Sequence, residues 1–413
     1  MKKNTTRVIL LLFITGIAAW ALPALVKKAT RVPEHYPFMY YSSLLRELCV
    51  IDYSDDETPL STLSGKKFSE AECDSLLPLL NFRQLMADGK LPETIEGIEI
   101  TPPLLRSKSV VFRYNPEVTR SPATRLHVLF ESMPRRVGIE MPDDVFRLGE
   151  RVEFIDCKTN RVNEEKSARF QQALERRGYR FPARWSSGNP NPRKAYDEGY
   201  FSLDAAGHLF HLKMVNGKPY VRDTRVDEQV EVAAFSMFEA TDKRFYGFLF
   251  GKQGDAYILE ARDGKYHPLK LDIAPFDLLR DRMVIMGNLL YWNVSVTTPT
   301  GRDYYALKTT TLEQVARHRV AHQPDPWERL SSWIFPFYLT FDDPDSAYLY
   351  PRLHFTGRRG WLAHLLPALL VGLLVPNDRR RRVYHSLYIL ITGFAGLLAL
   401  LALPRFITKK PRK

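Results

Sequence analysis

The sequence predicts a mainly β protein, arranged as a propeller-like array of about six β repeats with transmembrane helices at both ends. A pattern of strand, turn, strand, tight turn and strand occurs at residues 201–220 and again at residues 248–267. The second tight turns, Asn216-Gly217 and Asp263-Gly264, are 47 residues apart, a spacing within the range of propeller blades. The chain also begins and ends in apolar runs that are flanked by basic residues.

The same spacing continues on both sides of these turns. It reaches the strand-like residues 304–308 in the forward direction and residues 154–160 in the backward direction. Residues 110–112 and 339–350 extend the series to about six units with a period of about 47 residues. A β unit of this size cannot bury both faces of its sheet alone, so repetition around an axis would cover them. A sandwich or barrel with evenly spaced strands is the alternative.

The net charge of +12 is concentrated at the two ends of the chain. Residues 1–31 carry six Lys/Arg and no acid, and residues 352–413 carry twelve Lys/Arg and one Asp, which leaves −5 for residues 32–351. A nucleic-acid-binding protein places its basic residues on the folded domain. We therefore expect a lipid bilayer as partner, and no nucleic acid.

The N-terminal apolar run covers residues 8–26 without a charge, which is long enough to cross a hydrocarbon core. We interpret residues 1–29 as a transmembrane anchor. Because Ala19-Trp20-Ala21 fits a cleavage site, a signal segment is the alternative.

The C-terminal part, residues 356–413, is predicted to form a transmembrane hairpin with a basic tail. Its apolar runs cover residues 361–375 and 383–403, and the first is short for a span. The four arginines at 379–382 predict a cytoplasmic bend, which leaves the main domain outside the cytoplasm. The basic tail would then also face outward, against the same tendency.

The region between the ends is predicted as two parts. Residues 30–106 are a mixed α/β region, in which Ser69 and Glu72 form a capping box at the start of a helix. Residues 107–355 are the propeller-like domain, with a helical insertion near residues 163–178.

Two further segments have a clear composition. The Pro/Gly/Asn-rich residues 185–193 predict a surface loop above the repeats. Residues 312–322 have a helical composition that ends at a proline-containing break.

Residues 81–100, NFRQLMADGKLPETIEGIEI, resemble a segment of an uncharacterised bacterial family of membrane-anchored proteins of unknown function. The resemblance covers residues 65–100 and extends loosely over the downstream repeats. It implies a membrane anchor and an occurrence alongside ABC-transporter components. It implies no activity, and no catalytic residue is carried over from it.

Histidine patterns offer two candidate metal sites, and both have a simpler interpretation. His208, His211 and Met214 are three residues apart on an expected strand, so successive members point to opposite faces and cannot share one ion. His318 and His322 would share one face of a helix, but two imidazoles are half of a zinc site. We expect no bound metal or cofactor.

Loops and cysteines supply the remaining candidates. Residues 247–253 resemble a phosphate-binding loop with one residue too few, and a hairpin turn is the better interpretation. Asp342, Asp343 and Asp345 form an acidic turn that needs no cation. Three cysteines are too few for a disulfide scaffold, so either Cys49 pairs with Cys73 or all three are buried reduced thiols.

These observations leave two hypotheses about function. The first is a non-catalytic, membrane-tethered extracytoplasmic module that binds a partner and assists a membrane complex such as an ABC-type transporter. The second is a membrane-bound hydrolase with its site on the propeller axis, where loops from several repeats would meet. No residue is assigned a catalytic role, because no catalytic motif occurs in the sequence.

Overall fold

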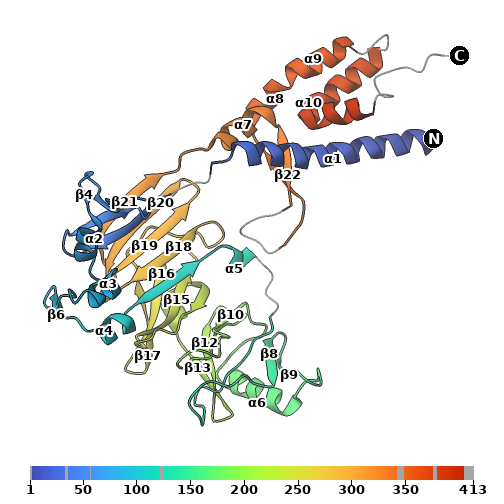
Figure 1. Ribbon diagram of the computed structural model, residues 1–413. Coiled ribbons are helices and arrows are strands. Elements are labelled where there is room, and N and C mark those ends of the chain that lie inside the picture. Colours follow the sequence, from blue (N-terminus) through green and yellow to red (C-terminus); the bar gives the residue numbers. More distant parts are fainter. Residues whose placement is uncertain are drawn as a thin grey trace. The chain divides into compact units, whose positions relative to one another are not determined.

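The computed structural model describes residues 2–32, 36–55, 57–120, 125–341, 348–374 and 379–403. The chain forms two compact units, one made of Met1–His35 and His322–Lys413 and the other of Tyr36–Ala321. The larger unit, Tyr36–Ala321, is mainly β and consists of antiparallel sheets, as predicted (Figure 1).

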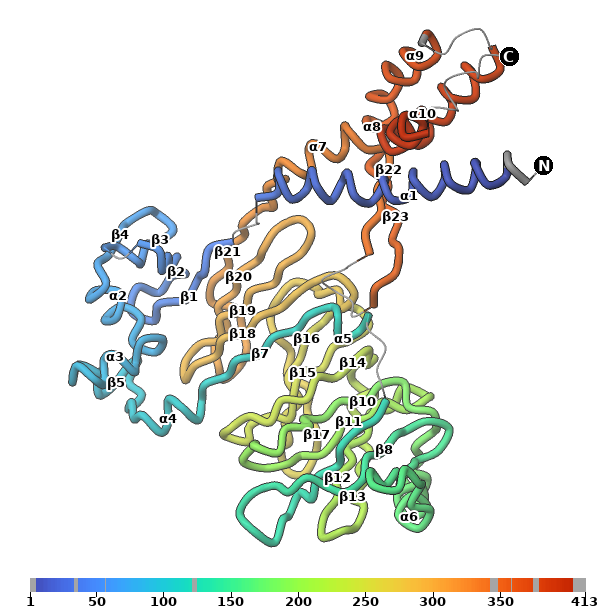
Figure 2. Tube along the Cα trace, turned by 45° about the vertical axis from the view of Figure 1, so that its right-hand side comes forward, coloured from blue at the N-terminus to red at the C-terminus, as the bar shows by residue number. Residues whose placement is uncertain are grey.

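Three consecutive four-stranded antiparallel meanders form the centre of the larger unit (Figure 2). β7 (Val110–Tyr114) pairs with the outer edge of β18 and gives the last of these sheets a fifth strand. The first sheet consists of β10 (Trp185–Gly188), β11 (Tyr200–Leu203), β12 (Leu209–Val215) and β13 (Lys218–Asp223), the second of β14 (Val232–Met237), β15 (Phe245–Gly251), β16 (Ala256–Arg262) and β17 (Lys265–Lys270), and the third of β18 (Arg282–Gly287), β19 (Tyr291–Thr298), β20 (Gly301–Lys308) and β21 (Gln314–Ala321).

The predicted 47-residue offset relates the first two of these sheets. Shifting β12 and β13 by 47 residues reproduces the bounds of β16 and β17. Asn216-Gly217 and Asp263-Gly264 occupy equivalent hairpin turns, with φ of 50° and 71° in both. Positive φ at both central residues is the type I′ geometry, whose twist matches that of the flanking strands. Two local turn signals therefore set the register of two sheets.

Replacing Gly217 or Gly264 by valine is expected to lower the free energy of unfolding by about 1 kcal/mol or more, because a β-branched residue is strained at positive φ. A Cβ at Gly217 would meet no atom within 4 Å, so backbone strain is the cause that this variant isolates. Gly149→Val is the control, since Gly149 is equally open and does not have positive φ. Chemical denaturation measures the change, and equal effects at Gly149 and Gly217 would contradict the assignment.

The repeat is less regular outside this region than predicted. Residues 110–112 lie in β7, which joins the third sheet instead of starting a unit. Residues 154–160 contain the end of β9 and a turn, but β8 (Asp144–Leu148) and β9 (Val152–Asp156) form a separate two-stranded sheet. Residues 339–340 end β22 in the smaller unit. At these outer positions the 47-residue spacing locates individual strands but not complete sheets. Long-range pairing decides which sheet each strand joins.

Apolar clusters join neighbouring sheets in series. One cluster joins the first and second sheets through Phe201 and Leu249, and another joins the second and third through Phe248 and Trp292. The remaining four-stranded sheet of the larger unit packs on the third through residues that include Tyr41. It consists of β1 (Phe38–Ser42), β2 (Glu47–Ile51), β3 (Leu60–Thr62) and β4 (Lys67–Phe68). Each interior sheet thus buries both faces between neighbours.

Helix α6 (Glu164–Glu175) is the predicted insertion, and it packs its apolar face on β9 and on the first sheet. Asn163 caps it by accepting a hydrogen bond from the backbone N–H of Lys166 at 3.0 Å. The capping box also forms, because Glu72 accepts from the backbone N–H of Ser69 at 2.9 Å. The other short elements are α2 (Glu70–Leu76), α3 (Phe82–Ala87), β5 (Thr94–Ile95), β6 (Ile98–Glu99), α4 (Pro102–Ser107), α5 (Glu117–Arg120) and the 3₁₀ turn η1 (Val226–Glu228).

Two predicted segments differ in the structure. The expected helix at residues 312–322 is the edge strand β21, which alternates between exposed and half-buried residues beside β20. Arg317 and Arg319 on β21 both bind Asp303 of β20, so cross-strand ion pairs stabilise the strand. The expected loop at residues 185–193 begins as strand β10, because residues 185–188 pair with β11 in antiparallel register. The Trp185 indole also donates to the carbonyl of Phe235 at 2.7 Å.

The smaller unit contains the apolar helices. α1 (Lys2–Thr30) and α10 (Arg379–Ala402) are long and apolar enough to cross a membrane, and α1 also fits a signal sequence. Leu11 of α1 and Ile389 of α10 lie in one apolar cluster, which also includes Ala368 of α9. The other elements of this unit are α7 (Pro326–Ile334), β22 (Phe337–Thr340), β23 (Arg352–Phe355), α8 (Arg358–Ala363) and α9 (Leu365–Leu374).

Cys49, Cys73 and Cys157 are free thiols, and the first two are buried in one apolar cluster. Burial raises the pKa of the Cys49 thiol to about 12 and also raises that of Cys73. Of the two alternatives, the structure has the reduced one, although Cys157 is exposed where a buried thiol was expected.

Candidate functional site

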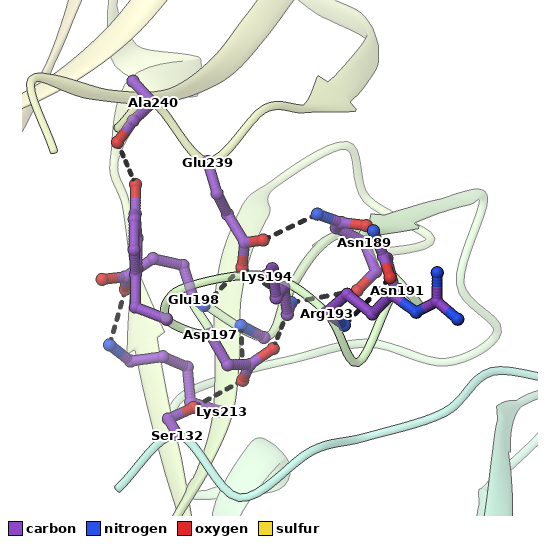
Figure 3. A network of polar contacts seen from close by, with 12 residues as sticks. Ser132, Asn189, Asn191, Arg193, Lys194, Asp197, Glu198, Lys213, Glu239 and Ala240 are labelled. Carbon is purple, nitrogen blue, oxygen red and sulfur yellow. Dashed lines mark hydrogen bonds and ion pairs between the residues drawn. The ribbon is translucent and has the colours of Figure 1, made fainter. Parts of the chain in front are cut away.

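A group of buried charged side chains in the larger unit surrounds Lys194, in the connection between β10 and β11 (Figure 3). The Lys194 ammonium lies 2.5 Å from Asp197 and 2.8 Å from Glu239, and it donates to the carbonyl oxygen of Asn189 at 2.9 Å. The side chains of Lys194, Asp197 and Glu239 are 6%, 2% and 3% exposed. We call these three residues and their hydrogen-bond partners the Lys194 network.

The two carboxylates of the network have further donors. Burial raises the pKa of Glu239, although its hydrogen bonds and Lys194 oppose that shift. The donors to Asp197 are the Ser132 hydroxyl (2.7 Å) and the Gly199 N–H (3.0 Å), and those to Glu239 are the Glu198 N–H (2.8 Å) and the Asn189 side-chain amide (2.8 Å). Each carboxylate oxygen therefore has at least one donor.

Local sequence explains why the chain forms this network. The connection from Asn189 to Gly199 contains two prolines and crosses from β10 to β11 without regular structure, so side chains must satisfy its backbone. Gly199 has φ of 65°, and a Cβ there would lie 2.2 Å from the carbonyl oxygen of Leu212. The turn can thus press against β12 only with glycine at this position.

The network continues to His211 on β12. The His211 Nε2 lies 2.6 Å from the carbonyl oxygen of Glu198, and its Nδ1 lies 2.7 Å from the hydroxyl of Tyr266. Burial lowers the pKa of His211 to about 3, so the ring is neutral at pH 7. A carbonyl only accepts, so Nε2 carries the proton and Nδ1 accepts from Tyr266. The Glu198 carboxylate in turn binds Lys213 at 2.7 Å.

The structure separates the histidines that the sequence grouped. His208 is exposed in the turn before β12, where it lies 3.9 Å from Asp204, whereas both nitrogens of the buried His211 have protein partners. His318 lies on strand β21, and His322 lies outside that strand and 3.0 Å from Glu328 in the smaller unit. Within the described ranges, no group of three metal-binding side chains gathers.

The two other candidates were the loop at residues 247–253 and the acidic turn at residues 342–345. Residues 247–251 belong to β15, and the turn follows from Lys252, where the Gly251 N–H donates to the carbonyl oxygen of Asp255 at 2.9 Å. The expected hairpin turn is therefore confirmed from Gly251 onward. Asp342, Asp343 and Asp345 lie outside the described residues.

The ion pairs and hydrogen bonds of the Lys194 network limit the reactions that its side chains could catalyse. A lysine nucleophile needs a neutral amine with a free lone pair, and a general base needs a carboxylate that faces a substrate proton. Lys194 donates to three oxygens, and both carboxylates are buried and accept from several donors. The arrangement therefore fits a rigid support for the loop, and sequence motifs gave no signal for it.

The smaller unit has a hollow of about 390 Å³ that is lined by the C-terminal end of α1, by α7 and by β22. Its lining includes Trp20, Trp327 and Tyr338, with Trp327 and Tyr338 in edge-to-face contact at 5.5 Å. Lys27, Lys28 and Arg31 also line it. Aromatic and basic side chains gathered at the end of an apolar helix are typical of a membrane–water interface.

Comparisons with known proteins give a family but no activity. Residues 38–307, more than half of the chain, match the model of a family described as a domain of unknown function (DUF4857). No curated protein matches the chain. Hydrazine synthase of Kuenenia stuttgartiensis is similar over 55% of this chain and 53% of its own, with 10% identity and a TM-score of 0.24. The chain thus spans about half the length of that protein, and a likeness at this level carries no argument.

Proposed function

We propose that this chain, which belongs to the DUF4857 family, is a membrane-tethered extracytoplasmic module that binds a partner and has no catalytic activity. The partner that we propose is a membrane complex, such as a transporter of the ABC type. The apolar helices α1 and α10 would hold the chain in the cytoplasmic membrane. The sheets of the larger unit would form a propeller-like array that presents its loops to the partner.

The observation that carries the non-catalytic part is the complete pairing of the Lys194 network. Its three charged side chains hold the connection between β10 and β11 in place. They are too deeply buried to contact a substrate. The hydrolase alternative would need two carboxyl groups on opposite sides of a cavity that can hold a substrate and a water molecule. Asp197 and Glu239 instead share one lysine in a buried position, so this pair does not supply the arrangement that a hydrolase needs.

The tether is supported by the composition of the smaller unit. The hollow at the end of α1 combines aromatic rings with three cations, as expected at lipid head groups. Arg379 to Arg382 begin α10, and four arginines in one short connection favour the cytoplasmic side. If α9 crosses the membrane as the other arm of the predicted hairpin, this orientation would place the larger unit on the other side of the membrane.

Cysteine labelling in intact spheroplasts tests the orientation. In a Cys157→Ser background, which removes the exposed native thiol, we expect an impermeant maleimide to label Arg193→Cys and to leave Arg380→Cys unlabelled. Both positions are exposed, so lysis should allow both to react. The same membranes should retain the chain after an alkaline wash, because α10 alone is long enough to span.

Two outcomes would contradict the proposal in different ways. Labelling at position 380 with a silent position 193 would place the larger unit in the cytoplasm. Release of the chain by alkaline carbonate would remove the tether itself.

A further inference from the structure

A groove of about 600 Å³ in the larger unit has five basic side chains among its twelve lining residues. It lies between the C-terminal end of α6, the segment from β13 to η1, and the hairpin turn between β16 and β17. Five basic side chains line it together with two acidic ones, Asp223 and Glu228. The five are Arg176, Arg177, Arg222, Arg225 and Lys265, and we call this feature the arginine groove.

The five cations differ from most basic residues of the sheets around them. Lys213, Arg244 and Lys270 each have a carboxylate partner within 2.8 Å. Within the part of the chain that the structure describes, no ion pair is formed by any of the five cations that line the groove. All five are exposed residues, and like charges that face one cavity repel each other, so an anion that binds there would relieve the repulsion.

The fold brings these cations together from distant parts of the sequence. Phe170 and Leu174 of α6 pack in one apolar cluster with Val221 of β13, which brings Arg176 and Arg177 to the side of β13. The type I′ turn at Asp263-Gly264 directs Lys265 toward the same cavity. A different turn geometry would move the β17 end of the groove.

One guanidinium of the groove is already held in place. Arg222 donates to the carbonyl oxygen of Gly264, and its guanidinium lies 5.5 Å from the ring centroid of Tyr266. The Tyr266 hydroxyl is in turn held by His211. A planar guanidinium with a fixed position presents its remaining N–H groups as a fork, which fits the paired oxygens of a phosphoryl group.

From this geometry we propose that the arginine groove binds a small ligand with two or more phosphoryl groups. The volume of the cavity is in the range of small-molecule sites. The five Lys/Arg side chains and the two carboxylates, Asp223 and Glu228, give the groove a net charge of +3. A ligand that neutralises this charge needs more than one anionic group. The groove ends within three short segments, whereas a nucleic acid would need a basic stripe over a longer surface.

The full-length chain in phosphatidylcholine nanodiscs, titrated with inorganic triphosphate by calorimetry at low salt, tests this inference. We expect saturable binding that weakens about tenfold or more in R176Q/R177Q, since a hydrogen bond between charged groups contributes roughly that factor. R222K keeps the charge but loses the fork, and it should also weaken binding. R135Q/R136Q is the matched control, because these adjacent exposed arginines do not line the groove and should leave binding within about twofold.

A second titration identifies the source of the phosphoryl groups. Farnesyl pyrophosphate binding more tightly than inorganic pyrophosphate would assign a lipid-borne diphosphate, and the reverse order would assign a free ligand. Neither arm depends on the proposed tether or on the orientation of the larger unit. Membrane retention therefore tests the proposed function separately.

Three results would overturn the inference. The first is a wild-type chain that does not bind triphosphate. The second is an equal loss of binding in R135Q/R136Q and R176Q/R177Q, which would show attraction to net charge alone. The third is random-sequence duplex DNA that binds more tightly than triphosphate through the same arginines, because the site would then be a nucleic-acid surface.

Discussion

Replacing Lys194 by methionine is expected to lower the free energy of unfolding of the larger unit by about 3 to 5 kcal/mol. The substitution leaves Asp197 and Glu239 buried without their common cation, and a buried unpaired charge is one of the most destabilising changes in a folded domain. For a unit of this size, the change corresponds to a melting temperature that is lower by roughly 6 to 20 °C. Thermal unfolding of the intact chain in nanodiscs measures it.

Two further variants make this prediction specific. Glu239→Gln removes one of the two negative charges and keeps an amide at the same place, so its cost should be smaller, about 1 to 2 kcal/mol. Lys252→Met breaks the ion pair with Glu231, whose side chains are 50% and 64% exposed, and should cost less than about 1 kcal/mol. If Lys194→Met were as mild as Lys252→Met, the network would not support the fold.

The sequence predicted those parts of the fold that depend on local signals. The Asn216-Gly217 and Asp263-Gly264 turns could be identified because only a few residue types take positive φ at two successive positions. Helix α6 could be identified from the spacing of its apolar residues and from the glycine that follows it. The apolar lengths of α1 and α10 were equally plain.

Long-range pairing decided the features that the sequence did not predict. β7 joins β18, which lies about 170 residues later in the chain, and no local pattern indicates that partner. The segment at residues 312–322 has helix-forming residues, but pairing with β20 and the ion pairs to Asp303 override that preference. Strand choice in such cases depends on tertiary contacts that a single sequence does not show.

The two polar features of the larger unit were missed for the same reason. Lys194, Asp197 and Glu239 come from a loop and from a separate strand end, and each has an ordinary sequence context. The arginine groove collects its cations from the two residues after α6, from β13 and the residue before η1, and from the first residue of β17. The only local signal was the Arg176-Arg177 pair at the end of a predicted helix, which also fits a solvated helix end.

Acidification is expected to destabilise the larger unit through His211. The pKa of His211 is about 3 in the folded state because of burial, against about 6.5 in the unfolded chain. The unfolded state therefore binds more protons between these values, and stability falls as the pH falls from about 6.5 toward 3. The slope from this one group is about 1.4 kcal/mol per pH unit, or roughly 2 to 3 kcal/mol between pH 6.5 and 4.5.

Comparison of slopes isolates this contribution from the rest of the chain. The His211→Gln variant loses the titrating ring, so its stability should depend less on pH over this range than that of the wild type. Glu239, whose pKa is raised by burial, contributes a change of the opposite sign above its unfolded value, but it is present in both proteins and cancels. Parallel slopes for His211→Gln and the wild type would mean that His211 is not held neutral between Tyr266 and Glu198.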